Sequence, residues 1–162
     1  MCGLAGFANA ALHPAEAQAL LQRLARCMVH RGPDGEGTLW HADDRVGLAH
    51  RRLSVIDTST AGAQPMESAS GRLAIVFNGE IVNAPELAES LRGRGVRFRG
   101  HSDTEVLLEA IEAWGLGAAL ERAAGMFAFA VHDRQARTLD LVRDRLGIKP
   151  VSYTHLTLPT KA

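Results

Sequence analysis

Residues 72–80 read RLAIVFNGE, with five consecutive apolar residues followed by an Asn–Gly–Glu triplet. An apolar run of this length, with β-branched residues in it, is typical of a strand that is buried on both faces. The triplet adds a side-chain amide, a glycine and a carboxylate where the strand ends. The stretch therefore predicts a central buried strand that delivers polar groups in a turn at its end.

Strands and helices are expected on both sides of this central strand. Apolar patterns predict strands at residues 4–8, 38–40, 46–57, 96–98, 126–133 and 138–144, the last two joined as a hairpin. Helices are predicted to begin at Pro14, at Asn83–Pro85 and at Ser102 or Asp103, where a proline or a capping residue comes first. Runs of strands with helices between them favour layered sheets covered by helices.

Composition limits the classes of function. The 162 residues fit one domain, and 18 basic residues balance 18 acidic ones. Because no basic stripe stands out, neither nucleic acid nor a membrane surface is expected as a partner. No apolar run is long enough to span a bilayer, and the first residues lack the pattern of a signal peptide. Two cysteines, Cys2 and Cys27, fit a reducing compartment, so we expect a cytoplasmic protein.

The chain starts with MCGLAGF, which places a cysteine directly after the initiator methionine. A free thiol has a pKa of about 8.5 and needs a base before it acts as a nucleophile near neutral pH. A chain-end amine titrates near pH 8 and can take up a thiol proton and return it to a leaving group. Removal of Met1 would give Cys2 such an amine. Taken alone, an incidental cysteine is the more common explanation.

The Asn78–Gly79–Glu80 triplet contains groups suited to acyl transfer. Gly79 can bring a backbone N–H close to a ligand, and Asn78 adds a side-chain donor, so the two can form an oxyanion hole. Glu80 can accept a hydrogen bond from a substrate ammonium group. A hairpin turn that contains a glycine is the simpler alternative for the same three residues.

Two more side chains can complete a ligand site. Neighbouring residues of a strand point to opposite faces, so one of Arg51 and Arg52 can bind a carboxylate while the other stays in solvent, although a solvated strand edge is the more common case. Asp103 can hold a substrate amine or simply cap a helix. Together, an arginine, two acids and a thiol with oxyanion donors describe one ligand, a free amino acid with an amide side chain.

Seven motifs occur in order: MCGLAGF, HRGPDGEG, LAHRRLSVID with AGAQPM after it, FNGEIVN, SDTEVLLEA, GMFAFAVHD and RDRLGIKP. As a set they resemble the N-terminal glutaminase domain of glutamine-dependent asparagine synthetases, which are class II glutamine amidotransferases of the Ntn-hydrolase superfamily. The resemblance covers residues 1–150. It implies an α+β fold, a four-layer αββα sandwich with mainly antiparallel sheets that is incomplete at its C-terminus. Residues 151–162 do not continue the pattern and are expected to be a non-native tail.

The resemblance also implies a reaction, the hydrolysis of L-glutamine to glutamate and ammonia. Cys2, exposed by removal of Met1, would be the nucleophile and would form a thioester. Asn78 and Gly79 would form the oxyanion hole for the attacked carboxamide.

The remaining implied roles concern the binding of glutamine. Arg52 would hold its α-carboxylate, and Glu80 and Asp103 would hold its amino group. The segment 30–35, HRGPDG, would build a wall near the nucleophile and take no chemical step. Val82 stands where the family usually has a tyrosine, which changes a packing contact near the pocket.

No cofactor or metal is expected in this chain. ATP and Mg²⁺ are implied only for the missing synthetase domain that uses the ammonia in this family, and its SGGxDS-like loop does not occur in the sequence. A homodimer is a further expectation for the full-length protein. Two alternatives stay open: a catalytically inactive truncated fragment, and the glutaminase domain of another amidotransferase.

Overall fold

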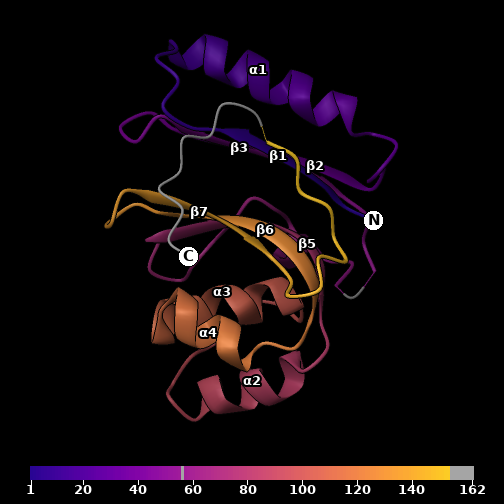
Figure 1. The fold of residues 1–162 in the computed structure, drawn as a ribbon, viewed down its shortest axis with the longest axis vertical. Helices are drawn as coiled ribbons and strands as arrows, with labels where there is room; N and C mark the ends of the chain where they lie inside the picture. Colours follow the sequence, from indigo (N-terminus) through magenta and orange to yellow (C-terminus); the bar gives the residue numbers. More distant parts are fainter. Residues whose placement is uncertain (56, 154–162) are drawn as a thin grey trace.

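The computed structural model describes residues 1–55 and 57–153 as four stacked layers (Figure 1). Helix α1 (Pro14–Cys27) covers one sheet, and three helices cover the other: α2 (Ala84–Arg92), α3 (Asp103–Trp114) and α4 (Leu116–Arg122). This order of helix, sheet, sheet and helix confirms the αββα sandwich that the sequence implied. No helix within these two ranges is long and apolar enough to cross a membrane.

Every strand pairing in the two sheets is antiparallel within the described residues. The first sheet has the order β1–β3–β2, formed by Gly3–Phe7, Val46–Arg52 and Gly35–His41. The second has the order β4–β5–β6–β7, formed by Met66–Glu67, Leu73–Ile81, Gly125–Asp133 and Thr138–Arg143. The non-native tail expected at residues 151–162 lies mostly outside the described residues, which end at 153, so it stays a prediction.

Strand β5 is the central strand that the sequence predicted, and both of its faces are covered. Leu73, Ile75, Phe77 and Ile81 pack in the core between the second sheet and its helices. Ala74 and Val76 point the other way, into a smaller core between the sheets. Because successive side chains of a strand alternate in direction, the continuous apolar run serves two cores at once.

The prediction of a turn at residues 78–80 is wrong, because these residues are part of a strand. These residues continue β5 to Ile81 and pair with β6, where Gly79 lies opposite Phe127. A Cβ at Gly79 would collide with the backbone carbonyl of Met126. The glycine therefore serves close packing of two strands, and the partner that keeps the segment extended lies nearly 50 residues further along the chain.

Two other strand predictions need correction. Strand β3 ends at Arg52 instead of Asp57, because its partner β2 begins at Gly35, which pairs with Arg52. Residues 96–98 form no strand. The N–H groups that follow them, those of Arg99 and Gly100, donate to the Glu105 carboxylate at 2.7 and 2.9 Å, so a side chain takes the place of a ladder partner.

The helix starts agree with the sequence, although the caps differ. α1 begins at Pro14 with a capping box formed by His13 and Glu16. α3 is capped by Ser102, whose Oγ accepts the Glu105 N–H at 3.2 Å. Asn83 occupies the cap position of α2 but makes no capping bond there.

His50 of β3 lies between the two sheets and is fully buried. Its Nε2 lies 3.1 Å from the carbonyl oxygen of Phe77 on β5, so the ring joins the sheets by a hydrogen bond. Its Nδ1 has no hydrogen-bond partner among the described residues. Burial, opposed by the Phe77 hydrogen bond and aided by the Arg52 charge, lowers the pKa of His50 to about 4. The ring is therefore neutral in the folded protein at neutral pH.

A neutral His50 predicts a loss of stability in acid. The unfolded chain takes up this proton below pH 6.5 but the folded protein only below about pH 4, so stability falls as the pH drops through that window. We expect the free energy of unfolding to lose about 3 kcal/mol more in the parent protein than in His50→Gln between these pH values. Urea denaturation at several pH values measures this, with exposed His30→Gln as the control. Equal pH dependence in the parent and His50→Gln would contradict the prediction.

Candidate active site

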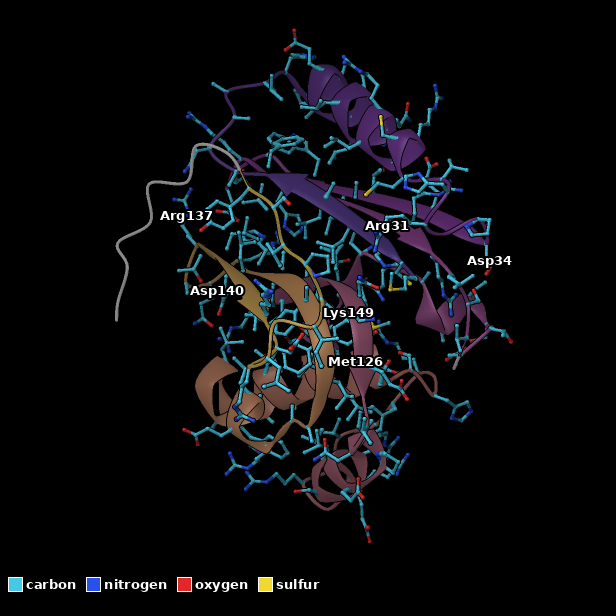
Figure 2. The ribbon with its side chains drawn as sticks, turned by 45° about the vertical axis from the view of Figure 1, so that its right-hand side comes forward. Arg31, Asp34, Met126, Arg137, Asp140 and Lys149 are labelled. Carbon is cyan, nitrogen blue, oxygen red and sulfur yellow. The ribbon has the colours of Figure 1, made fainter. Side chains whose placement is uncertain are left out.

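The residues singled out in the sequence line one cavity of about 270 Å³: Cys2, Arg52, Asn78, Gly79, Glu80 and Asp103. They come from the chain end, the end of β3, the end of β5 and the start of α3. Met126 and Lys149 also line the cavity, and they lie on the same side of the molecule as Arg31 and Asp34 (Figure 2). Arg137 and Asp140 lie on the other side of this view.

Cys2 is fixed from two sides. Its Sγ accepts the backbone N–H of Leu53, just beyond β3, at 3.4 Å. Its carbonyl oxygen accepts the Nε of Arg31 at 3.1 Å. Met1 precedes it, lines the same cavity and is 61% exposed.

The segment 30–35, expected to form a wall, supports this contact. The Asp34 N–H donates to the carbonyl oxygen of Arg52 at 3.0 Å, and the Asp34 carboxylate accepts the Ser54 N–H at 2.8 Å. Gly32 lies so close to the backbone of Arg51 that no Cβ would fit. The turn therefore holds the end of β3, and with it the backbone next to the Cys2 sulfur.

The free edge of β5 carries the N–H groups of Phe77, Gly79 and Ile81, and Phe77 and Gly79 line the cavity. β4 pairs with β5 only at residues 74 and 75, so the edge beyond has no neighbouring strand. The Phe77 N–H donates to Gln64 Oε1 at 2.6 Å, and the Ile81 N–H donates to Asp103 Oδ2 at 2.9 Å. N–H groups two residues apart on a strand point the same way. The Gly79 N–H, between the two satisfied groups, therefore points into the cavity.

The side chains of β5 complete this wall. Asn78 and Glu80 share the face of β5 that turns toward the first sheet, because they follow Ala74 and Val76 at intervals of two residues. Asn78 is buried, whereas Glu80, at the strand end, is exposed. One stretch of strand thus supplies an amide side chain, a backbone N–H and a carboxylate to the same cavity.

Arg52 and Arg51 point to opposite faces of β3. Arg51 binds the Glu36 carboxylate at 2.7 Å and the carbonyl oxygen of Gly32 at 2.9 Å. Arg52 lines the cavity, and its guanidinium donates to the carbonyl oxygens of Asp57 and Ser59. Carbonyl oxygens hold the group in place without neutralising its charge, so the cation remains available to an anion in the cavity.

Asp57 anchors the loop that holds Arg52. Its carboxylate accepts the His101 N–H at 2.9 Å and both the N–H and the Oγ of Ser59, at 2.8 and 2.6 Å. The hydrogen bonds from His101 and Ser59, with a smaller contribution from the Arg52 charge, lower the pKa of Asp57 to about 2. An ionised Asp57 thus ties the loop after β3 to the segment before α3.

Asp103 is the first residue of α3, and Ser102 is the cap. Burial raises the pKa of Asp103, and the neighbouring Glu80 charge adds to the increase, while hydrogen bonds from the backbone oppose it. Two carboxyl groups close enough to affect each other favour a cation between them. The pair is thus suited to an ammonium group.

Several residues at the site had no individual role in the sequence analysis, which treated segment 30–35 only as a wall. Arg31, Asp34 and Gln64 fall in motifs that the sequence made visible, but their contacts are to backbone groups far along the chain. Asp57 stood at the end of an expected strand. Among the described residues, no group of three or more His, Cys, Asp or Glu side chains is arranged to hold a metal ion.

Comparison with known proteins agrees with this geometry. A family model described as a glutamine amidotransferase domain matches residues 1–160. Asparagine synthetase [glutamine-hydrolyzing] 1 of Bacillus subtilis is 40% identical over 158 residues, which are 95% of this chain and 24% of that protein. Asparagine synthetase B of Escherichia coli is 36% identical over 151 residues, covering 93% and 26%.

A solved structure supports the fold. The glutamine phosphoribosylpyrophosphate amidotransferase of B. subtilis, complexed with ADP and GMP, superposes with a TM-score of 0.55 at 28% identity. The match covers 65% of this chain and 24% of that one.

The fold and the cavity define a member of the Ntn-hydrolase class, and the chain belongs to the glutamine amidotransferase domain family. Within that family its relatives include glutamine-hydrolysing asparagine synthetases, which confirms the branch that the motifs indicated. The chain spans about a quarter of the length of these relatives.

Gly79 gives a test of how β5 and β6 build the cavity wall. An added Cβ would collide with the Met126 carbonyl and the Phe127 backbone, so Gly79→Ala should lower the free energy of unfolding by about 1–3 kcal/mol. Gly117→Ala, in α4 with open space around it, is the matched control and should be neutral or stabilising. Urea denaturation measures both. Equal stability of the two variants would contradict the close strand packing.

Proposed function

We propose that this chain is a glutaminase domain that hydrolyses L-glutamine to glutamate and ammonia with Cys2 as its nucleophile. The observation that supports it most directly is one cavity of about 270 Å³ lined by all six residues that this reaction requires. The volume lies just below the usual range for ligand pockets, about 300–1,000 Å³, which suits a free amino acid better than a larger substrate.

In the proposed complex, the two ends of glutamine are held by opposite charges. Arg52 binds the α-carboxylate with a guanidinium that carbonyl oxygens already orient, so little rotational freedom is lost on binding. Glu80 and Asp103 bind the ammonium group. This arrangement directs the carboxamide toward the chain end and the edge of β5.

The reaction starts after Met1 has been removed. The α-amine of Cys2 accepts the thiol proton, and the sulfur attacks the carboxamide carbon to form a C–S bond. Asn78 and the Gly79 N–H stabilise the oxyanion, which typically contributes about 10²–10³ in rate per donor. The amine then protonates the nitrogen as the C–N bond breaks and ammonia leaves. Water attacks the thioester, releases glutamate and restores the thiol.

The ammonia has a proposed use outside this chain. The relatives are about four times longer, and we propose that a synthetase domain, with ATP and Mg²⁺, would take up the ammonia in a longer protein of this kind. A homodimer of that longer protein, and a cytoplasmic location, remain predictions.

A first test concerns the nucleophile. The protein with Met1 removed, verified by mass spectrometry, should release glutamate from L-glutamine, and Cys2→Ala should abolish the release. Cys27→Ala, which alters an exposed thiol at the end of α1, is the matched control and should keep full activity. Unchanged activity in Cys2→Ala would rule out the assignment. A parent protein that melts cooperatively but releases no glutamate would favour an inactive fragment.

A second test concerns Arg52. Loss of hydrogen bonds to a charged group costs about 1.5–3 kcal/mol, so Arg52→Met should raise the KM for glutamine about 10- to 100-fold. Arg137→Met is the control, because Arg137 also binds a carbonyl oxygen, that of Asp43, and is not among the residues that line the cavity. Steady-state kinetics measure both variants. A KM for Arg52→Met within about threefold of the parent value would remove Arg52 from the binding site.

A further inference from the structure

Gln64 lies between the 3-10 turn η1 (Thr60–Gly62) and β4, and its buried side chain lines the cavity. Its Oε1 accepts the Phe77 N–H of β5 at 2.6 Å, and its Nε2 donates to Thr104 Oγ1 of α3 at 3.3 Å. The backbone carbonyl oxygen of Gln64 lies where a Cβ on Gly37 of β2 would stand. One residue therefore contacts the first sheet, the second sheet and α3.

The Phe77 N–H is the group on the free edge of β5 next to the Gly79 N–H. Without an acceptor, a buried N–H costs about 1–3 kcal/mol, or it draws water into the cavity. It would also be a second donor on the same edge, able to compete for the substrate carbonyl. Because the Gln64 side chain accepts the Phe77 N–H, the Gly79 N–H is the donor on this edge that remains for the ligand.

The second hydrogen bond of Gln64 supports the same edge from α3. Thr104 follows Asp103, whose carboxylate holds the Ile81 N–H at 2.9 Å. The N–H groups on both sides of Gly79 are therefore tied to α3, at Ile81 directly and at Phe77 through Gln64. Movement of β5 relative to α3 would break both ties.

We propose that Gln64 is a positioning residue that clamps β5 so that the Gly79 N–H lies where the oxyanion forms. The role rests on the proposed glutaminase function and concerns the transition state more than the bound substrate. Gln64 takes no proton and forms no covalent bond.

The kinetic experiment compares Gln64→Met with the parent protein, both with Met1 removed. Methionine keeps the length of the side chain but accepts no strong hydrogen bond. Loss of a correctly placed oxyanion donor should lower kcat about 10- to 100-fold and leave the KM for glutamine within about threefold. Gln18→Met is the matched control, because Gln18 also donates to a threonine hydroxyl, Thr38 Oγ1 at 2.9 Å, outside the cavity. Its kcat should not change.

Gln64→Glu serves as a rescue. A glutamate oxygen can still accept the Phe77 N–H, and the Thr104 hydroxyl can turn and donate to the other oxygen. Its kcat should lie closer to that of the parent than to that of Gln64→Met. A purely packing role for Gln64 predicts the reverse, because a buried carboxylate would disturb packing more than a thioether does.

Amide hydrogen exchange tests the clamp without substrate. In Gln64→Met, the Phe77 amide should exchange at least about tenfold faster, while amides in the middle of β6 keep their rates. Faster exchange at Phe77 with kcat within about threefold of the parent would overturn the proposal, as would unchanged exchange at Phe77. A parent protein without glutaminase activity would instead refute the proposed function, and the exchange data would still show separately whether Gln64 clamps Phe77.

Discussion

The short length of β4 leaves the end of β5 without a strand on one side. β4 consists of Met66 and Glu67, so β5 has ladder partners on both sides only near its start. A buried edge of this kind must satisfy its N–H groups by other means. Side chains from a loop and a helix do so at Phe77 and Ile81, and the N–H between them faces the cavity. The candidate oxyanion site is thus a consequence of sheet geometry.

The same requirement explains why buried polar side chains gather around the cavity. Gln64, Asp103 and Asp57 each accept backbone N–H groups that no strand or helix reaches. Each bond also joins segments far apart in sequence, so it fixes the position of a candidate ligand group while it satisfies the backbone. Asp103 does both, because its carboxylate accepts the Ile81 N–H and the residue also lines the cavity.

The sequence predicted the central strand, the helix starts and, through its ordered motifs, the sandwich. Local sequence pattern was sufficient for these elements, because burial on both faces of a strand and helix capping depend on residues that are neighbours in the sequence. The prediction of strand ends failed at residues 78–80 and beyond Arg52. These ends are set by pairing with distant residues, namely Gly125–Phe127 for β5 and Gly35 for β3. The sequence identified the cavity residues by the chemistry of their side chains. The supporting contacts of Gln64 and Asp34 could not be predicted, because they join segments that are close only in the folded protein.

The candidate site also depends on how the two sheets pack against each other. Cys2 directly precedes β1 and Arg52 ends β3 of the first sheet, whereas Asn78, Gly79 and Glu80 belong to the second. Sliding of one sheet against the other would therefore separate the candidate nucleophile from the candidate oxyanion donors. The core between the sheets contains two alanines, Ala74 and Ala130, besides valines and leucines, and its apolar contacts are non-directional. Two histidine contacts add directional links: His50 to the Phe77 carbonyl beside the cavity, and His41 to His132, whose Nδ1 atoms lie 2.8 Å apart. A hydrogen bond is more directional than an apolar contact, so these two links oppose sliding of one sheet over the other.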